Sequence, residues 1–358
     1  MNASNLNPSS SLINTPWPAG DLERVSACPV CGSAKRTVLH EGLIDNVFFV
    51  ALGRWTLHCC KQCRSAYLDP RPSPASIHKA YGTYYTHEAG GRQDDAARLS
   101  LLRRLRRTLA NGYLNHRYGT QRQPATRLGV WMAKILPGQR QALDSGFRYL
   151  PKPIQGQRLL DIGCGNGDFL VDAREAGWHV SGVEPDPKAA AAAWKRDLDV
   201  TTGTVDKLAA KSSCFDVITI SHVIEHVHDP IKLLKAAHRL LKPGGVVYID
   251  TPNIGSDGAQ LFGKNWRGLE TPRHLVLFNL ASLTSLLSAT GYNGVKTERR
   301  TTVWQFTYLS SLRMASGNSP YGQVPARLPW FERLRLSIAF TETAHLEFIT
   351  LTARKGDV

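Results

Sequence analysis

The sequence of 358 residues has no apolar run near the roughly 18 residues that a membrane-spanning helix needs. Residues 1–20 also lack the basic start and apolar centre of a secretory signal. Glycine (30 residues) and proline (20 residues) are at ordinary levels, and 42% of residues are hydrophobic, which argues against a disordered or collagen-like chain. We therefore expect a globular, cytoplasmic protein that is long enough for two compact units.

Acidic residues are scarce in one segment. The chain has 44 lysines and arginines against 29 acids, a net charge of +15, and residues 98–158 hold thirteen of these basic residues with a single acid, Asp144. The excess charge therefore belongs to one segment, and a chain-wide affinity for nucleic acid is a poor inference. That segment could face RNA, a phospholipid surface or a diphosphate-bearing substrate.

The sequence divides into four stretches. Residues 1–24 are rich in Ser, Asn and Pro without periodicity, which predicts a disordered tail. Residues 25–74 form a small cysteine-bearing module, and residues 75–150 predict a helical basic connector. Residues 151–358 predict the main domain, with an insertion at about 304–344 that could cover its site.

Two cysteine pairs have the spacing of a metal site. Cys28 and Cys31 form the first pair and Cys60 and Cys63 the second, and each pair has the two-residue gap of a zinc knuckle. Four thiolates complete a tetrahedral shell, so we expect a structural Zn²⁺. Cys59 could replace Cys60 but breaks this spacing. The alternatives are unligated buried cysteines or a disulfide.

The basic connector contains one amphipathic pattern. Leucines recur at helical spacing at positions 99, 102, 105 and 109, and arginines fill the remaining face. A helix over residues 98–114 could lie on an anionic membrane, giving peripheral contact at the inner membrane surface. The alternative is a helix packed on the catalytic domain with solvated arginines.

The main domain alternates short apolar strands with helical stretches. This pattern predicts a Rossmann-like, doubly wound α/β fold with a mostly parallel seven-stranded sheet, preceded by the zinc ribbon and the connector. We expect strands near 158–162, 179–184, 199–203, 215–221, 246–251, 294–302 and 346–353. We expect helices near 167–176, 186–196, 230–241 and 280–290.

A glycine-rich turn follows the first of these strands. A dinucleotide fingerprint would have a third glycine where this chain has Asp168, and a carboxylate at a helix N-terminus would repel a pyrophosphate. Glu184 ends the next strand, where an acid accepts hydrogen bonds from ribose hydroxyls. The pattern therefore favours a ribose-bearing, phosphate-free cofactor, and S-adenosylmethionine meets both conditions.

Four motifs carry a resemblance to a known family: DIGCGNGDF, GVEPD, FDVITISHVIEHVHDP and LLKPGGVVYIDTPN. They resemble the successive motifs of class I S-adenosylmethionine-dependent methyltransferases over about residues 154–300. YLDPRP and WRGLETPRHLVLFNLASLTSLL are similar to a bacterial group associated with sugars, polysaccharides and secondary metabolites. The resemblance implies cofactor contacts from Asp161, Gly163, Gly165, Gly167, Glu184, Thr204, Val205 and Ser221.

Histidines after the fourth and fifth strands are the candidate catalytic groups. His222 is our first candidate for a general base, because histidine titrates near working pH. Glu225 and His226 resemble the pair near the acceptor in sugar C-methyltransferases, and His274 follows the fifth strand. For each histidine the alternative is a hydrogen-bonded structural residue.

A second interpretation of the same segment is a metal site. In quinone-biosynthesis O-methyltransferases a Glu-x-x-Glu-His segment at this place is associated with a divalent metal, and His222 replaces the first Glu here. His222, Glu225 and His226 would suit a transition metal better than magnesium. We rank a catalytic divalent metal behind a metal-free site.

We therefore predict a methyltransferase that transfers a methyl group from S-adenosylmethionine to a small-molecule or glycan acceptor, such as a sugar or polysaccharide precursor, which could bear a phosphate. The first alternative is an rRNA or tRNA methyltransferase that binds RNA through the zinc module and the basic segment. The second is a non-catalytic zinc-ribbon interaction protein, against which the intact glycines and Glu184 argue.

Overall fold

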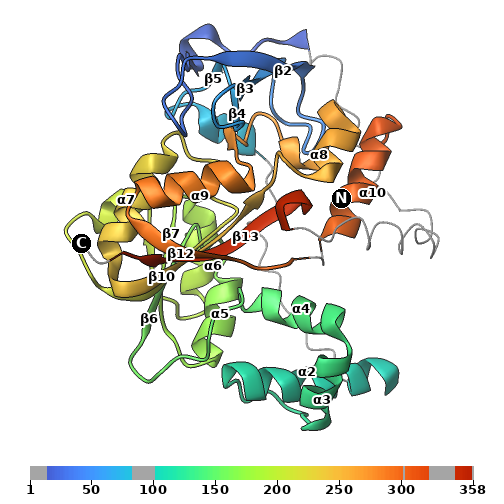
Figure 1. The fold of residues 1–358 in the computed structure, drawn as a ribbon, viewed down its shortest axis with the longest axis vertical. Coiled ribbons are helices and arrows are strands. Elements are labelled where there is room, and N and C mark those ends of the chain that lie inside the picture. The colour runs from blue at the N-terminus through green and yellow to red at the C-terminus, as the bar shows by residue number, and fades with distance from the viewer. Residues whose placement is uncertain (1–13, 83–100, 301–302, 322–342, 357–358) are drawn as a thin grey trace.

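The computed structural model of the chain describes residues 14–82, 101–300, 303–321 and 343–356. Within these ranges no helix combines the length and the apolar character needed to cross a bilayer. The described chain has three parts, namely the cysteine-bearing N-terminal module, a central sheet with helices on both faces, and a group of helices at the end opposite the module (Figure 1).

A seven-stranded sheet forms the centre, in the order β12-β13-β10-β9-β6-β7-β8. The five strands from β10 to β8 pair in parallel, and β13 pairs antiparallel with both of its neighbours. The predicted mostly parallel, doubly wound sheet is confirmed. The strands are β6 (Arg158–Ile162), β7 (His179–Glu184), β8 (Val200–Thr202), β9 (Phe215–Ser221), β10 (Leu241–Pro252), β12 (Tyr292–Thr297) and β13 (Phe348–Lys355).

Successive residues of each inner strand point to two different cores. In β6, Leu160 and Ile162 join the core that α7 and α9 cover, whereas Leu159 joins the core beneath α5 and α6. This alternation is what buries both faces of a parallel sheet. The helices around the sheet are α5 (Asp168–Glu175), α6 (Pro187–Trp194), α7 (Pro230–Leu240), α8 (Asp257–Phe262), α9 (Leu280–Ala289) and α10 (Trp304–Ala315).

Side-chain caps fix where several of these helices begin. The carboxylate of Asp186 accepts from the amide of Lys188 at the start of α6, and Asp229 accepts from Lys232 at the start of α7. Asn279 forms a capping box at the start of α9. Each cap satisfies an amide that the helix leaves unpaired. These caps place the helix starts beside the carboxyl ends of the preceding strands.

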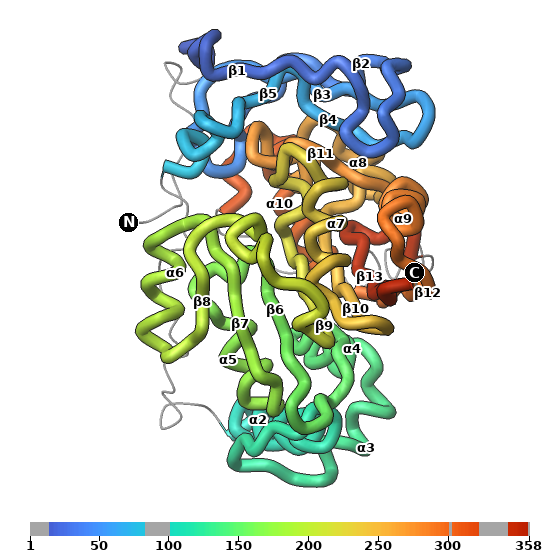
Figure 2. The backbone as a smooth tube through the Cα atoms, turned by 90° about the vertical axis from the view of Figure 1, so that its left-hand side faces the viewer, coloured from blue at the N-terminus to red at the C-terminus, as the bar shows by residue number. Residues whose placement is uncertain are grey.

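The predicted connector forms three helices, α2 (Leu101–Tyr118), α3 (Leu128–Ile135) and α4 (Pro137–Gly146). Tyr113, Tyr118 and Phe147 pack into the core beneath α5. These helices lie at the end of the molecule opposite the N-terminal module (Figure 1 and Figure 2). Residues 98–100 of the expected amphipathic helix lie outside the described residues.

The N-terminal module, which we call the Cys module (residues 25–74), shares a sheet with the main domain. Its sheet has the order β11-β4-β3-β2, and β11 (Val276–Leu277) comes from the loop after β10. The module's other strands are β2 (Arg36–Leu43), β3 (Trp55–Cys60), β4 (Ala66–Leu68) and β5 (Arg71–Pro72), and β5 pairs with β1 (Leu22–Glu23), which precedes the module. The module and the sheet share one hydrophobic core, so the module is not an independent unit.

The predicted disordered tail is too long at its C-terminal end. Trp17 is buried and packs edge-on against Trp55 of β3, with ring centroids 5.5 Å apart. Leu22 and Glu23 form β1, which pairs with β5. Burial of one large aromatic ring is enough to order this short segment, which composition alone had marked as irregular. Residues 1–13 lie outside the described residues.

The first part of the predicted insertion at 304–344 is α10, which packs against α8, and residues 322–342 lie outside the described residues.

Short 3-10 helices complete the described chain. The 3-10 helices are Ala19–Asp21, Ile77–Tyr81, Val205–Leu208, Gly263–Asn265, Arg267–Leu269 and Thr343–His345.

Candidate functional site

The glycine-rich turn joins β6 to α5. A Cβ atom at Gly163 would lie 2.4 Å from the side chain of Val223, so close packing requires glycine there. Gly165 has a positive φ of 56°, and a Cβ atom there would meet nothing within 4 Å. Gly165 therefore borders open space at the carboxyl edge of the sheet, where parallel sheets bind ligands. Gly167 caps the start of α5.

Glu184, at the end of β7, holds the turn in place. Its Oε2 accepts a hydrogen bond of 2.7 Å from the amide of Gly165, and its Oε1 accepts one of 2.9 Å from the amide of Asp186. Burial raises the pKa of Glu184, and the two amides oppose that shift. The structure thus places this acid beside the turn, as the sequence predicts.

Asp161 in β6 is buried and holds an arginine that sequence reasoning missed. Arg148, which follows α4, forms an ion pair with Asp161, and its guanidinium lies 3.6 Å from the centre of the Phe169 ring. Thr219 donates a hydrogen bond of 2.8 Å to the same carboxylate. No local pattern in the sequence pairs Arg148 with Asp161.

Asp168, whose carboxylate would repel the pyrophosphate of a dinucleotide, has a counter-ion. The guanidinium of Arg196 lies 2.6 Å from its carboxylate, and the Asp168 side chain is more than half exposed. This ion pair weakens the argument from charge repulsion. The other predicted cofactor residues lie where strands end, with Ser221 last in β9, and Thr204 and the buried Val205 just after β8.

His222 begins the loop after β9 with a positive φ of 55°. Its Nδ1 lies 3.4 Å from Oε1 of Glu225, and its Nε2 lies 3.2 Å from Oδ2 of Asp250. The amide of His222 also donates to the carbonyl of Asp250. The imidazole therefore sits between two buried carboxylates while 42% of its side chain stays exposed.

Glu225 is fully buried between histidines. Its Oε2 accepts a hydrogen bond of 2.9 Å from Thr251. Burial alone would raise the pKa of Glu225, but the hydrogen bond from His222 and the charges of His226, His222 and His274 lower it to about 2. An ionised carboxylate is thus kept in the interior by surrounding imidazoles.

His226 and His274 lie edge to face beside Glu225, with ring centroids 4.7 Å apart. Nδ1 of His226 is 3.0 Å from the hydroxyl of Tyr81 and 3.1 Å from the carbonyl oxygen of Arg273. Nδ1 of His274 is 2.8 Å from the carbonyl oxygen of Gly268, and burial lowers the pKa of His274 to about 4. Each Nδ1 is therefore committed to an oxygen partner.

Glu225, His226 and His274 bring one ligand atom each to within 4.8 Å of one another. Two imidazoles and a carboxylate are a donor set for a divalent transition metal. The structure thus puts His274 in the place that the sequence-based metal hypothesis gave to His222. Without a metal, hydrogen bonds to other residues hold the three side chains, namely those to Thr251, Tyr81 and the carbonyl oxygens of Arg273 and Gly268.

Residues 132–297 match a family described as "Methyltransferase domain". This part of the chain is a methyltransferase domain. The sequence-based prediction of this family is confirmed for the region that contains the glycine-rich turn and the group of Glu225, His226 and His274, which we call the histidine cluster.

Curated relatives match parts of the methyltransferase domain. A "Ubiquinone biosynthesis O-methyltransferase" from Cereibacter sphaeroides is 38% identical over 124 residues, which cover 32% of this chain and 50% of that protein. A protein of the same name from Methylocella silvestris is 27% identical over 164 residues, covering 40% of this chain and 64% of that protein. The chain spans about half the length of the first of these relatives.

Solved structures are similar at a lower level. A SAM-dependent methyltransferase from Archaeoglobus fulgidus is 20% identical, with a TM-score of 0.42 over 63% of this chain and 99% of that one. Phosphoethanolamine N-methyltransferase 2 from Haemonchus contortus is 21% identical, with a TM-score of 0.42 over 69% of this chain and 60% of that one.

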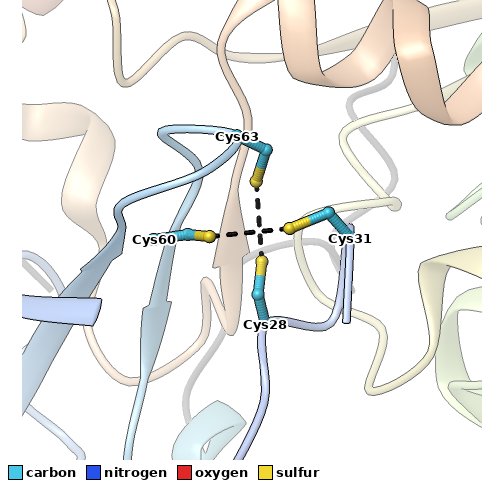
Figure 3. A group of neighbouring side chains, drawn as sticks. All are labelled: Cys28, Cys31, Cys60 and Cys63. Carbon is cyan, nitrogen blue, oxygen red and sulfur yellow. Dashed lines mark hydrogen bonds between the residues drawn. The ribbon is translucent and has the colours of Figure 1, made fainter. Parts of the chain in front are cut away.

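Four cysteines of the Cys module point toward a common centre (Figure 3). The Sγ atoms of Cys28 and Cys63 are 3.6 Å apart, and those of Cys31 and Cys60 are 3.5 Å apart. The hydrogen bond from Cys28 lowers the pKa of the Cys63 thiol to about 4, which favours a thiolate. Cys59 lies outside the cluster, as its spacing predicts. The four sulfurs fit a tetrahedral Zn²⁺ shell.

The Cys module is attached to the loop of the methyltransferase domain that carries His274. Strand β4 pairs with β11, which begins two residues after His274. The Asn279 side chain donates a hydrogen bond of 2.9 Å to the carbonyl of Cys63. The carbonyl of Glu225 accepts from the amides of Leu275 and Val276. The cysteine centre and the histidine cluster are therefore held by one continuous stretch of backbone.

Trp266 and Arg267 lie on the loop that leads to His274, and both side chains are bound within the protein. Trp266 is buried, and its indole nitrogen donates a hydrogen bond of 2.7 Å to Glu347, whose pKa burial raises to about 7. Arg267 is bound to Glu270 at 2.7 Å. Both side chains therefore support the loop around His274 and do not offer an open acceptor pocket.

Proposed function

We propose that the chain is a class I S-adenosylmethionine-dependent methyltransferase that acts on a small-molecule acceptor. One observation carries the proposal: inside a methyltransferase domain, Gly165 borders open space at the carboxyl edge of the sheet and its amide is held by Glu184. Glu184 stands at the end of a strand where an acid binds ribose hydroxyls, which suits the nucleoside part of S-adenosylmethionine.

The cofactor would be held by the residues around this turn. Asp161 and the three glycines would surround the methionine moiety, Glu184 the ribose, and Thr204, Val205 and Ser221 the remaining edge. Bound S-adenosylmethionine supplies a methyl group on a sulfonium, which an acceptor attacks in line. The protein's part is to orient the acceptor and to manage its proton.

His222 is the group we assign to proton transfer. Its side chain is exposed, while the neighbouring Glu225 and His274 are buried. Glu225 faces Nδ1 and Asp250 faces Nε2, so Nε2 would turn from Asp250 to the acceptor to take its proton, and Glu225 at Nδ1 would stabilise the imidazolium that forms. Glu225, His226 and His274 then act as positioning residues behind it.

A divalent metal at Glu225, His226 and His274 is the second candidate for this site. The anchored Nδ1 atoms support it, because metal-binding histidines commonly fix their tautomer through the other ring nitrogen. A bound ion would supply Lewis-acid polarisation of the acceptor. Metal content in the variant His274→Gln, measured against the wild type, separates this role from the metal-free network.

For the acceptor, the small-molecule class is supported by the names of the curated relatives, which are ubiquinone biosynthesis O-methyltransferases. A sugar or polysaccharide precursor is our finer proposal and rests on the resemblance of YLDPRP and WRGLETPRHLVLFNLASLTSLL to a bacterial group associated with such acceptors. An RNA acceptor is disfavoured because the Cys module and the basic helices lie at opposite ends of the molecule (Figure 1) and so do not form one RNA surface.

The Cys module would hold one structural Zn²⁺ through Cys28, Cys31, Cys60 and Cys63. Four protein ligands leave no position for substrate, so this ion would stabilise the module and take no part in methyl transfer.

The direct test is calorimetric titration of S-adenosylmethionine into the full-length protein, with NAD as a competitor class. Binding of the first compound alone supports the proposal, and binding of NAD alone or of neither contradicts it. Mass shifts of one methyl group in pools of sugar nucleotides, phenols and RNA would then identify the acceptor.

A further inference from the structure

Helix α2 has two halves with different surroundings. Its C-terminal half packs into the core beneath α5 through residues such as Tyr113 and Tyr118. Its N-terminal half is exposed, and Leu101, Leu102 and Leu105 are 55% to 83% accessible. Leucines of an amphipathic helix are normally covered by the protein that carries them. The packed-helix interpretation therefore holds only for the second half of α2.

Helix α3 carries a second set of exposed apolar side chains. Leu128, Trp131 and Ile135 are each more than half accessible and follow one another at helical spacing. On the other side of α3, Gly129 lies so close to α2 that a Cβ atom would meet the carbonyl of Leu109 at 1.8 Å. Since 128, 131 and 135 lie opposite the contact with α2, this stripe points away from the protein.

These six side chains are concentrated in a small part of the chain. The described residues include thirteen exposed large hydrophobics, and six of them lie in the α2–α3 hairpin (residues 101–135). Isolated exposed apolar residues are ordinary on protein surfaces, but six of them on two consecutive helices favour an interaction site.

The hairpin is also positively charged. Residues 101–135 contain eight lysines and arginines and no aspartate or glutamate. Arg122 is bound to Asp172 and Glu175 of α5, whereas Arg103, Arg106 and Lys134 lie on the exposed parts of α2 and α3. A surface that combines apolar side chains with exposed cations such as Arg103, Arg106 and Lys134 complements an anionic lipid bilayer, which offers both hydrocarbon and phosphate.

We infer that the α2–α3 hairpin docks on an anionic phospholipid surface. Leu102, Leu105 and Trp131 enter the boundary between headgroups and acyl chains, and the arginines lie at the phosphates. RNA would use the cations but would leave the leucines exposed, and a second copy of the chain would bring like charges together. The hairpin thus holds the enzyme at a membrane, independently of the acceptor.

Co-sedimentation of the full-length protein with vesicles tests this inference. We expect binding to phosphatidylcholine vesicles that contain phosphatidylglycerol, little binding to phosphatidylcholine alone, and weaker binding as salt is raised. Leu102→Ser with Trp131→Ser should lower the partition coefficient by at least about tenfold. Arg103→Gln with Arg106→Gln should lower it roughly tenfold, and less so at high salt.

Matched controls come from elsewhere on the surface. Leu261→Ser with Phe306→Ser removes two similarly exposed apolar side chains from α8 and α10, and Lys188→Gln with Lys195→Gln removes two cations from α6 and its C-terminal end. Both control proteins should bind vesicles like the wild type. No binding to anionic vesicles at low salt, equal losses in the controls, or hairpin-dependent binding to poly(U) without vesicle binding would overturn the inference.

Discussion

The guanidinium of Arg273 lies 2.5 Å from the carboxylate of Asp45, and both side chains are fully buried. Asp45 belongs to the Cys module and also accepts hydrogen bonds from the amides of Val50 and Ala51. Arg273 precedes His274, and its carbonyl oxygen contacts His226. One buried ion pair therefore joins the Cys module to the histidine cluster.

Removing one partner of this pair should be costly. We expect Asp45→Ala to lower the free energy of unfolding by about 3–5 kcal/mol, because, of the described carboxylates, only that of Glu270, at 3.6 Å, would then face the buried Arg273 guanidinium. Chemical denaturation measures the change. The exposed ion pair of Lys232 with Asp206 is the control, and Asp206→Ala should cost about 1 kcal/mol or less. Equal effects of the two substitutions would show that the buried pair adds no stability.

A large side chain at Gly165 should abolish cofactor binding. Gly165→Arg fills the open space beside the turn, so calorimetry should detect no S-adenosylmethionine binding while zinc content stays unchanged. Gly156→Arg is the matched control, because Gly156 also has a positive φ, with nothing within 4 Å of a Cβ atom, but lies before β6. Unchanged affinity in Gly165→Arg would defeat the assignment of the turn.

The histidines should separate into a proton-transfer group and a supporting group. His222→Ala should reduce turnover by roughly a hundredfold to ten-thousandfold with cofactor affinity nearly unchanged, since it removes the proton acceptor. His274→Ala should reduce turnover and also lower thermal stability, because His274 is buried. Full turnover in both variants would leave catalysis to positioning of the acceptor alone.

Zinc binding should distinguish two adjacent cysteines. Cys60→Ser removes a ligand and should lower zinc content and destabilise the Cys module, whereas Cys59→Ser should retain one zinc per chain, because Cys59 lies outside the cluster. Elemental analysis and thermal melting provide the two readouts. Zinc loss in the Cys59 variant with retention in the Cys60 variant would reverse the ligand assignment.

Local patterns predicted several strands of the main domain closely, whereas β10 begins five residues before the expected 246 and β12 ends five residues before the expected 302. Apolar runs ended by turn residues gave β6, β7 and β9 within a residue of their ends, because these strands are buried on both faces and carry a strong local signal. The cysteine pairs could also be recognised from the sequence, since the two cysteines of a metal knuckle lie close together in the chain.

Contacts between residues that lie far apart in the chain could not be predicted from local sequence patterns. Nothing near Arg148 predicts that it pairs with Asp161, and nothing near Asp45 predicts Arg273, which lies 228 residues away in the chain. The sequence placed His222 with Glu225 and His226, whereas the structure places His274 there. The reason is again a long-range contact, because the loop after β10 adds strand β11 to the sheet of the Cys module.

The sequence by itself determined the parallel sheet, the glycine turn with Glu184, and the four-cysteine set, because each depends on periodicity or on residues within one or two elements of each other. Only the tertiary structure decided that the Cys module joins β11 and that the histidines gather around a buried Glu225. It also decided which half of α2 stays uncovered. These outcomes depend on which segments, far apart in the sequence, bury their apolar side chains against each other, and no local pattern specifies that pairing.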